Sequence, residues 1–385
     1  MTSTTQADVV ILGAGPAGTA AAAHLGSLGV GRIVLVDRHD FPRDKTCGSG
    51  ISPRGIDTLK KLGVWSEVEP HSYRITGIRI VTPGGLDSWQ SAGDVADAVV
   101  CQRRILDHIL LKKAIARGTE FVPNFDASDV ITDQGRIAGI RARDGRQIHA
   151  RFTIIAGGSH CRVGLPEQRP KRVIQAIMGW WDGVPFRPGH VEMIFDRMVE
   201  PYYGWLFPES DTRVNIGICY EDPEGAGKIG AATSGAPARK NARELFQRFL
   251  DVHYAERLKG ATQLGGWKGH PVFWSYEIEK LTRPGAVVVG ESGLMTHPAT
   301  AEGIYQGMKS GMLGAEAIAD VLGGRMREPQ AFREYEKRCN KAFRLSFLGG
   351  GVFRRLIRTD ALDWMIKASE QPAMKSVTAK LMAAL

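Results

Sequence analysis

The residues best suited to chemistry near the start of the chain form a glycine-rich turn. The segment GAGPAG, residues 13–18, follows an apolar stretch at 8–12 and leads into a run of small residues typical of a helix. Gly13 allows a tight turn, Gly15 lets the backbone approach a pyrophosphate, and Gly18 lets helix and strand pack closely. The free N–H groups at the start of such a helix bind phosphate oxygens. The pattern predicts a strand and a turn that bind a dinucleotide.

An acidic residue follows at the spacing that this chemistry requires. A second apolar stretch, Ile33–Val36, ends at Asp37, and an acid about 20 residues beyond the turn is placed to accept a hydrogen bond from a ribose hydroxyl. Strand, turn, helix, strand and acid together favour a bound dinucleotide. A flavin and a nicotinamide dinucleotide both remain open at this point.

Three aromatic residues alternate along an expected strand in the second half of the chain. Tyr203, Trp205 and Phe207 are two residues apart, so a strand puts all three on one face. Such a face either lines a cavity for a long hydrophobic substrate or belongs to an ordinary sheet core. The spacing alone leaves both interpretations open.

Four segments, spread over most of the chain, together resemble the geranylgeranyl reductase family, a branch of the flavoproteins with a p-hydroxybenzoate hydroxylase-like fold. The first is the glycine turn with Asp37, and the second is the loop Cys47–Arg54, CGSGISPR. The third, Tyr203–Pro208, has the pattern Tyr-x-Trp-x-Phe-Pro. The fourth runs from Gly290 to Gly311 and contains HPATAEGI. The third and fourth segments are the most specific.

The resemblance implies a non-covalently bound FAD, with its pyrophosphate at the glycine turn and its adenosine ribose at Asp37. The helix that begins after Gly303 is expected to stabilise, with its positive end, the anion that forms at the flavin upon reduction. The implied cofactor contacts are Gly13, Gly15, Ala17, Gly18, Asp37, Arg38, Cys47, Gly48, Arg103, Gly290, Glu291, Gly303 and Ile304.

Two positions depart from the superfamily pattern. Glu291 stands where an aspartate is usual, and Gly157-Gly158 stands where Asp-Gly is usual. The longer side chain of Glu291 is expected to shift its contact with the ribityl chain. The missing acid at Gly157 predicts that NAD(P)H alone reduces the flavin slowly. We therefore expect an external electron donor, a ferredoxin or a separate flavin reductase.

Cys47 and His297 are the candidate catalytic residues. The thiol of Cys47 either faces the flavin, where it positions substrate or supplies a proton, or is a buried thiol of a glycine-rich loop. The imidazole of His297 lies in a loop before a helix, either beside the flavin ring or in solvent. Tyr203, Trp205 and Phe207 are the candidate substrate-binding residues.

The resemblance implies reduction of carbon–carbon double bonds in a hydrophobic, isoprenoid substrate by hydride from N5 of reduced FAD. The alternative is a flavin-dependent monooxygenase or halogenase acting on an aromatic metabolite, because the same fold hosts those reactions. The Trp-x-Trp-x-Ile-Pro signature of the halogenases is absent, since Tyr203–Pro208 stands in its place. A non-catalytic lipid carrier is a third, weaker alternative.

The order of the expected elements indicates an α/β fold, α+β overall, with a Rossmann-type FAD-binding domain, an interleaved antiparallel-sheet substrate domain and a helical C-terminal tail. A strand is expected over 75–81 and an amphipathic helix over 241–258, after a loop over 222–240. The expected domains are an FAD domain over 1–75, 99–168 and 274–324, a substrate domain over 76–98 and 169–273, and a helical region over 325–385.

Composition narrows the class of protein. The chain has 385 residues, 43% of them hydrophobic, and its five cysteines form no Cys-x-x-Cys pair, which predicts neither a disulfide framework nor a metal site. The net charge of +9 suits an anionic cofactor, an acidic redox partner or an anionic membrane surface. The sequence contains no basic run with interleaved aromatic residues, so it gives no indication of nucleic-acid binding. We expect a cytoplasmic enzyme, with peripheral membrane contact through the basic C-terminal segment as a further option.

Overall fold

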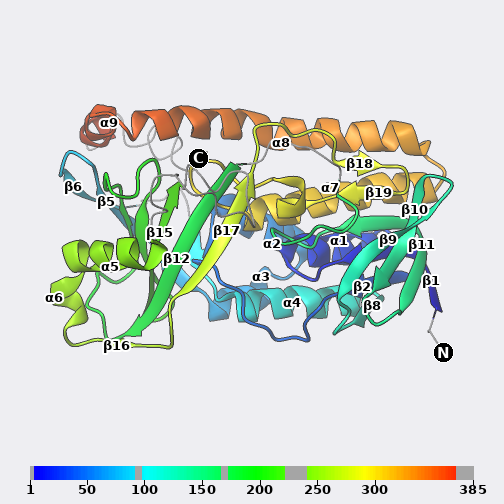
Figure 1. Ribbon diagram of the computed structural model, residues 1–385, viewed down its shortest axis with the longest axis horizontal. Coiled ribbons are helices and arrows are strands. Elements are labelled where there is room, and N and C mark those ends of the chain that lie inside the picture. Colours follow the sequence, from blue (N-terminus) through cyan, green and yellow to red (C-terminus); the bar gives the residue numbers. More distant parts are fainter. Residues whose placement is uncertain (1–3, 92–97, 166–171, 222–240, 370–385) are drawn as a thin grey trace, which may run out of the picture.

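Two eight-stranded β-sheets lie side by side, and a long helix spans both of them (Figure 1). The computed structural model describes residues 4–91, 98–165, 172–221 and 241–369. The loop expected over 222–240 and the end of the expected helical tail, 370–385, lie outside the described residues.

The first sheet carries the glycine turn. Five of its strands run parallel in the order β19-β11-β1-β2-β8, and the remaining three, β9, β10 and β18, are antiparallel to their neighbours. A parallel sheet is covered on both faces, which is why β2 is buried at every residue. The strands are β1 (Thr4–Leu12), β2 (Ile33–Val36), β8 (Thr119–Val122), β9 (Ala127–Asp133), β10 (Arg136–Ala142), β11 (Gln147–Ile155), β18 (Thr282–Arg283) and β19 (Ala286–Val288).

Three helices cover one face of this sheet, and two of them, α1 and α7, are rich in small residues. In α1 and α7, alanine and glycine let the two helix backbones approach closely: a Cβ on Gly311 would lie 2.2 Å from the carbonyl oxygen of Ala17. The close approach brings the start of α7 beside the start of α1. These helices are α1 (Pro16–Ser27), α4 (Arg103–Ala116) and α7 (Ile304–Leu322), with the short η2 (Gly290–Gly293) before α7.

The second sheet carries the aromatic strand. It has the order β16-β12-β15-β14-β13-β5-β6, with β17 also paired to β12, and it is antiparallel except between β13 and β5. Its strands are β5 (Gly77–Val81), β6 (Asp87–Ser91), β12 (Arg172–Asp182), β13 (His190–Ile194), β14 (Gly204–Pro208), β15 (Arg213–Glu221), β16 (Thr262–Gln263) and β17 (Lys268–Trp274). The helix α5 (Ala242–His253) packs on its outer face through Phe246, Phe249 and Leu250, and the short α6 (Ala255–Leu258) follows it.

A small unit joins the two sheets. It consists of a three-stranded sheet in the order β3-β7-β4 and the helices next to it in the chain. Its elements are β3 (Gly50–Ile51), α2 (Pro53–Leu62), α3 (Trp65–Val68), η1 (Glu69–His71), β4 (Tyr73–Ile75) and β7 (Ala98–Val100). The Cys47 loop enters this unit directly, so the unit holds that loop between the sheets.

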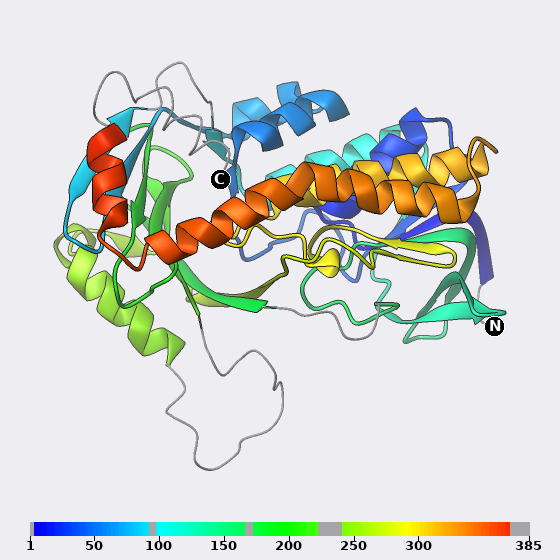
Figure 2. The same cartoon turned by 90° about the horizontal axis from the view of Figure 1, so that it is seen from above.

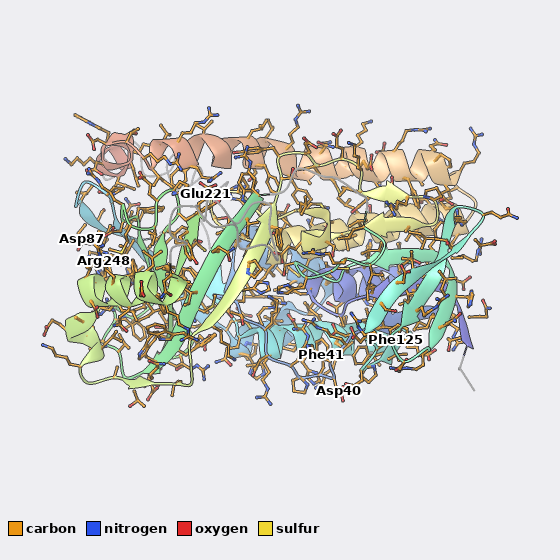
Figure 3. The ribbon with its side chains drawn as sticks, viewed as in Figure 1. Asp40, Phe41, Asp87, Phe125, Glu221 and Arg248 are labelled. Atoms are coloured by element: carbon orange, nitrogen blue, oxygen red, sulfur yellow. The ribbon has the colours of Figure 1, made fainter. Side chains whose placement is uncertain are left out.

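The long helix α8 (Glu328–Leu356) ties the two halves together, and α9 (Ala361–Ser369) follows at its end (Figure 2). At one end the Tyr335 hydroxyl donates to the carbonyl of Val288 in the first sheet. At the other end Arg354 forms a 2.9 Å ion pair with Glu221, which lies at the end of β15 below the helix (Figure 3). No helix in the described part of the chain is both long and apolar enough to cross a membrane.

The predicted fold class is confirmed, with two local corrections. The strand expected over 75–81 is two strands in different sheets, because the N–H groups of Thr76 and Gly77 both bond to the carbonyl of Gly189 and turn the chain. The helix expected over 241–258 breaks at Tyr254, whose buried ring packs on Phe249. The division into domains stays a prediction.

Candidate active site

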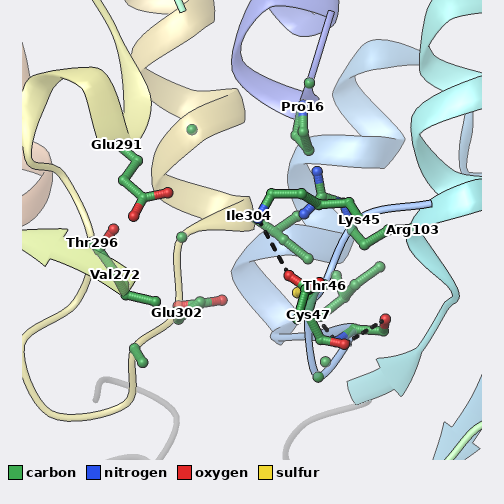
Figure 4. A pocket seen from close by; sticks show the side chains of 18 of the residues that line it. Pro16, Lys45, Thr46, Cys47, Arg103, Val272, Glu291, Thr296, Glu302 and Ile304 are labelled. Carbon is green, nitrogen blue, oxygen red and sulfur yellow. Dashed lines mark hydrogen bonds between the residues drawn. The ribbon is translucent and has the colours of Figure 1, made fainter. Parts of the chain in front are cut away.

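A single cavity of about 510 Å³ runs from the glycine turn to the aromatic strand. Figure 4 shows part of its lining, with Glu291 and Glu302 on one side and Lys45, Cys47 and Arg103 on the other. Among the predicted site residues, Gly18 and His297 do not line it. Those that do are Gly13, Gly15, Ala17, Asp37, Arg38, Cys47, Gly48, Arg103, Tyr203, Trp205, Phe207, Gly290, Glu291, Gly303 and Ile304.

The three glycines of the turn have distinct local roles. Gly13 has a φ of +102°, and a Cβ there would lie 2.5 Å from the carbonyl oxygen of Ala156. A Cβ on Gly18 would lie 1.8 Å from the oxygen of Gly13, so Gly18 shapes the turn. Gly15 faces the cavity, and among the described residues the only atom within 4 Å of an added Cβ is an Arg43 nitrogen at 3.7 Å. Gly15 therefore presents bare backbone to a ligand.

Asp37 fixes the turn and borders the cavity. Its Oδ2 accepts a 2.8 Å hydrogen bond from the N–H of Ala14, and its Oδ1 accepts one of 3.0 Å from His39. Each carboxylate oxygen has capacity for a second hydrogen bond. Asp37 can thus hold the turn and still accept a ribose hydroxyl.

The starts of two helices meet at the cavity without a side-chain cap. Gly15 is the N-cap of α1 and Gly303 is the N-cap of α7, and neither helix has an acidic residue in its first turn. Uncapped N–H groups and the helix dipole together attract negative charge. Between the two helix starts, Gly290 has a φ of +61° and a Cβ there would lie 3.0 Å from Ala17. The two helices create a path of positive potential along the cavity.

A buried group of two arginines and one aspartate adds to this potential. Asp107 is fully buried and accepts two hydrogen bonds from Arg103, at 2.7 and 2.8 Å. Arg43 also reaches Asp107, at 3.3 Å, and its buried Nε has no hydrogen-bond partner in the described residues. One carboxylate against two guanidinium groups leaves one positive charge at the cavity. The sequence analysis missed Arg43 as a cavity residue, because its position depends on its contact with Asp107.

The aromatic wall and the Cys47 loop face each other across the cavity. A Cβ on Gly48 would lie 3.4 Å from both Phe207 and Trp205, so a methyl group added to this loop would reach the wall. The indole N–H of Trp205 donates to Asn215 at 2.7 Å, and a Cβ on Gly217 would lie 2.3 Å from the indole ring. A glycine and an asparagine of β15 therefore fix the orientation of Trp205.

A second polar cluster lies where β17 meets the loop before Cys47. Lys45 Nζ and Ser159 Oγ each lie 2.8 Å from His270 Nε2. Burial lowers the pKa of Lys45 to about 8, with help from Arg103 and against the opposing effect of Glu291. Burial and the charge of Lys45 lower the pKa of His270 to about 3, so its imidazole is neutral. Lys45 and His270 are 225 residues apart in the chain, and no sequence pattern connects them.

Glu291 lines the cavity as predicted and is held in an unexpected way. Its Oε1 accepts a 3.0 Å hydrogen bond from the backbone N–H of Phe273 in β17. Burial raises the pKa of Glu291, while Lys45 opposes that effect. The extra methylene of Glu291, compared with aspartate, lets it reach the second sheet. Its contact with the ribityl chain stays a prediction.

Glu302 is a cavity residue that the sequence analysis did not select. Its Oε2 accepts a 3.2 Å hydrogen bond from Gln306. Its Oε1 is buried, and no donor in the described part of the chain lies in hydrogen-bonding geometry to it. Burial raises its pKa, although Ser52 and Gln306 lower it. Two residues earlier, the carbonyl of Thr300 accepts from the Tyr203 hydroxyl. Glu302 is thus a protonatable group at the aromatic end of the cavity.

His297 lies in neither of the two positions expected for it, because it does not line the cavity and is not exposed to solvent. The side chain is fully buried under α8, where Nε2 donates to the carbonyl of Ser346 at 3.2 Å. Nδ1 accepts from the N–H and the hydroxyl of Thr300, at 3.2 and 3.0 Å. Burial lowers the pKa of His297 to about 4, so the ring is neutral with both nitrogens engaged. His297 positions the loop that carries Glu302.

These observations fit one cofactor. An open glycine turn, an Asp37 with capacity to accept a further hydrogen bond, two uncapped helix starts and Arg43 suit the polar parts of a flavin dinucleotide. The family model described as "FAD binding domain" matches residues 6–344. The chain belongs to the FAD-binding domain family. It is an FAD-dependent oxidoreductase with the features of the geranylgeranyl reductase branch of these flavoproteins.

Two relatives with similar sequences are named as reductases. A menaquinone reductase of Mycobacterium tuberculosis is 30% identical over 81% of this chain and 76% of its own length. A digeranylgeranylglycerophospholipid reductase of Methanothermobacter thermautotrophicus is 28% identical over 88% of this chain and 83% of its own. Both relatives are named as reductases, and both cover most of this flavoprotein.

Two solved structures share its fold. A geranylgeranyl bacteriochlorophyll reductase-like protein from Thermoplasma acidophilum has a TM-score of 0.82 and 22% identity, covering 99% of this flavoprotein and 96% of that chain. The flavin-dependent brominase Bmp2 has a TM-score of 0.80 and 18% identity, covering 99% and 94%. Because a reductase-like protein and a brominase fit almost equally well, the fold alone does not distinguish their reactions.

Proposed function

We propose that this flavoprotein reduces carbon–carbon double bonds in a hydrophobic, isoprenoid substrate. The observation that carries the proposal is the apolar end of the cavity, where Trp205 and Phe207 face the Cys47 loop. Alanine and methionine side chains of the same sheet, Ala176 and Met178, continue this lining. An extended apolar chain would bury its surface against these side chains.

Reduction of a double bond needs a hydride and a proton. When FAD is bound and reduced, it supplies the hydride. We assign the proton to Glu302: its O–H bond breaks as a C–H bond forms on the substrate, and water returns a proton to the carboxylate. The buried, protonatable carboxyl group at the aromatic end supports this role. Cys47, which also lines this end, is proposed to position the substrate.

The names of the relatives support the substrate class. One relative is named for a phospholipid that carries geranylgeranyl chains and another for menaquinone. A monooxygenase or halogenase is the runner-up, because a brominase shares the fold. The Tyr203–Pro208 sequence in place of the halogenase signature weighs against it.

An external electron donor is part of the proposal. The acid usual at the position of Gly157 is missing, and a Cβ at Gly157 would lie 2.8 Å from Cys161 Sγ, so this loop has no room for a side chain there. A ferredoxin or a flavin reductase would then reduce the flavin, and the positive net charge favours an acidic partner. Rapid flavin bleaching by NADPH alone in stopped-flow measurements would refute this part.

Anaerobic turnover tests the reaction. FAD-loaded protein, reduced with dithionite under nitrogen, is mixed with a geranylgeranyl lipid or a polyprenyl quinone, and products are analysed by mass spectrometry. The expected result is addition of two hydrogens per reduced bond, with a matching oxidation of the flavin. No product without oxygen, together with oxygenated or halogenated aromatic product in air, would establish the runner-up instead.

A further inference from the structure

The outer face of α8 exposes apolar residues in a row. Leu345, Leu348 and Val352 are 83%, 48% and 55% exposed. Their spacing of three and four residues puts them on one side of the helix. The opposite side is buried through Phe343 and Phe347, so the helix cannot rotate to hide the row without losing these contacts. Figure 1 shows α8 along one edge of the molecule, with no other drawn element outside it.

Basic residues flank this row on the same face. Lys341, Arg344 and Arg355 are exposed, and in the described part of the chain none of them has an ion pair with an acid. From Lys341 to Arg358 the sequence contains no aspartate or glutamate. We call Lys341, Arg344, Leu345, Leu348, Val352 and Arg355 the α8 face.

We propose that the α8 face docks on the surface of an anionic lipid bilayer. Apolar residues that enter the acyl boundary, with cations level with the headgroups, are the combination by which a helix lies in a membrane interface. The following helix, α9, exposes Trp364 to 75%, and tryptophan favours the same interface. Both views show α9 at the end of α8. The inference goes beyond the proposed reaction and does not depend on it.

Charge distinguishes a bilayer from a second copy of this chain. In a symmetric dimer each α8 face would meet the same face of its partner. Lys341, Arg344 and Arg355 would then approach like charges with no acid on the face to pair them. An anionic bilayer supplies the missing negative charge and an apolar layer below it.

Vesicle flotation tests the proposal. FAD-loaded protein is mixed with vesicles of phosphatidylcholine alone or with roughly 30% phosphatidylglycerol, a content that gives an anionic surface. We expect binding only to the anionic vesicles, and at least roughly tenfold weaker binding in 0.5 M salt, because salt screens the cations. The apolar variant Leu345→Ser/Leu348→Ser/Val352→Ser and the charge variant Lys341→Gln/Arg344→Gln/Arg355→Gln should each lose binding by roughly tenfold or more.

A matched control separates this face from general surface hydrophobicity. Ile115 and Val252 are exposed to 47% and 59% on α4 and α5, so Ile115→Ser/Val252→Ser removes similar apolar surface elsewhere. This control should bind anionic vesicles like wild type. Flavin content and melting temperature should be unchanged in all variants, as should turnover of a short, detergent-dispersed substrate, which keeps a failure here separate from a failure of the proposed reaction.

Three outcomes would overturn the proposal. The first is an apolar variant that floats with anionic vesicles as well as wild type does. The second is equal loss in the Ile115→Ser/Val252→Ser control. The third is a wild-type dimer in light scattering that becomes a monomer in the apolar variant while neither binds vesicles, which would make the α8 face a contact between two copies.

Discussion

The two ends of the cavity are built in different ways. At the glycine turn, backbone atoms define the surface, and the turn and the acid that holds it lie close together in sequence, from Gly13 to Asp37. At the aromatic end, side chains define the surface, and they come from segments up to 255 residues apart, Cys47 and Glu302 among them. Backbone geometry tolerates almost no substitution, whereas side chains can be exchanged to suit a substrate. This difference explains how one fold keeps its cofactor and changes its reaction.

The largest effect is expected at the glycine turn. Gly18→Ala puts a methyl group 1.8 Å from the Gly13 oxygen and should cost about 3 kcal/mol or more of stability, with loss of bound flavin. Gly15→Ala meets nothing closer than 3.7 Å, so it should fold but bind FAD roughly tenfold more weakly, since its methyl group occupies cavity space. Flavin absorbance and urea unfolding measure both. A Gly18→Ala protein with full flavin content would contradict the view that the glycine turn tolerates almost no substitution.

At the aromatic end, Glu302→Gln should reduce kcat by about 100-fold, the usual contribution of a general acid. Flavin content should stay normal. Glu302 must be protonated to act as the acid, and its pKa is raised. The kcat of the wild type should therefore fall as the pH rises through that pKa. The variant should not show this decline in its pH profile. The exposed Glu279→Gln serves as the control. A variant with wild-type kcat and pH profile would remove Glu302 from the chemistry.

Substitutions in the aromatic wall should weaken substrate binding and leave FAD binding unchanged. Trp205→Ala would also leave Asn215 without its indole partner and cost about 3–5 kcal/mol of stability, so Phe207→Ala is the cleaner change. We expect its KM to rise about tenfold through lost apolar contact, with flavin content unchanged. Phe186, a half-buried phenylalanine outside the cavity lining, provides the matched control Phe186→Ala. Steady-state kinetics that leave KM at the wild-type value would show that the wall is only sheet core.

The smallest effect on turnover is expected at His297. His297→Gln should lower stability by about 2 kcal/mol through lost hydrogen bonds while kcat stays within about threefold, the range of an indirect effect. The folded-state pKa of about 4 is below the ordinary 6.5, so the contribution of His297 to stability is present above pH 6.5 and is lost as the pH falls toward 4. The variant should lack this part of the acid destabilisation in calorimetry. A hundredfold lower kcat at unchanged stability would restore a chemical role.

The sequence predicted what local spacing determines. The turn, Asp37 and the alternation of Tyr203, Trp205 and Phe207 follow from chain geometry. Asp37, the three aromatic residues and most of the turn line the cavity. The sequence did not predict Arg43 and His270 as cavity residues, because their positions depend on partners far away in the chain. His297 was misplaced for a related reason: its loop was identified, but the side-chain direction is set by the Ser346 carbonyl of α8. Contacts between distant segments carry no periodic signal in a single sequence.

The span of α8 also limits how the molecule can move. Its 29 residues make a rod about 43 Å long at 1.5 Å per residue, fastened to the first sheet by Tyr335 and to the second by Arg354. A hinge that swung the sheets apart would have to bend this rod or break one of its fastenings. The distance between the two sheets is therefore fixed. The length of substrate chain that fits in the cavity is set by this distance and not by a movement that closes the sheets on the substrate.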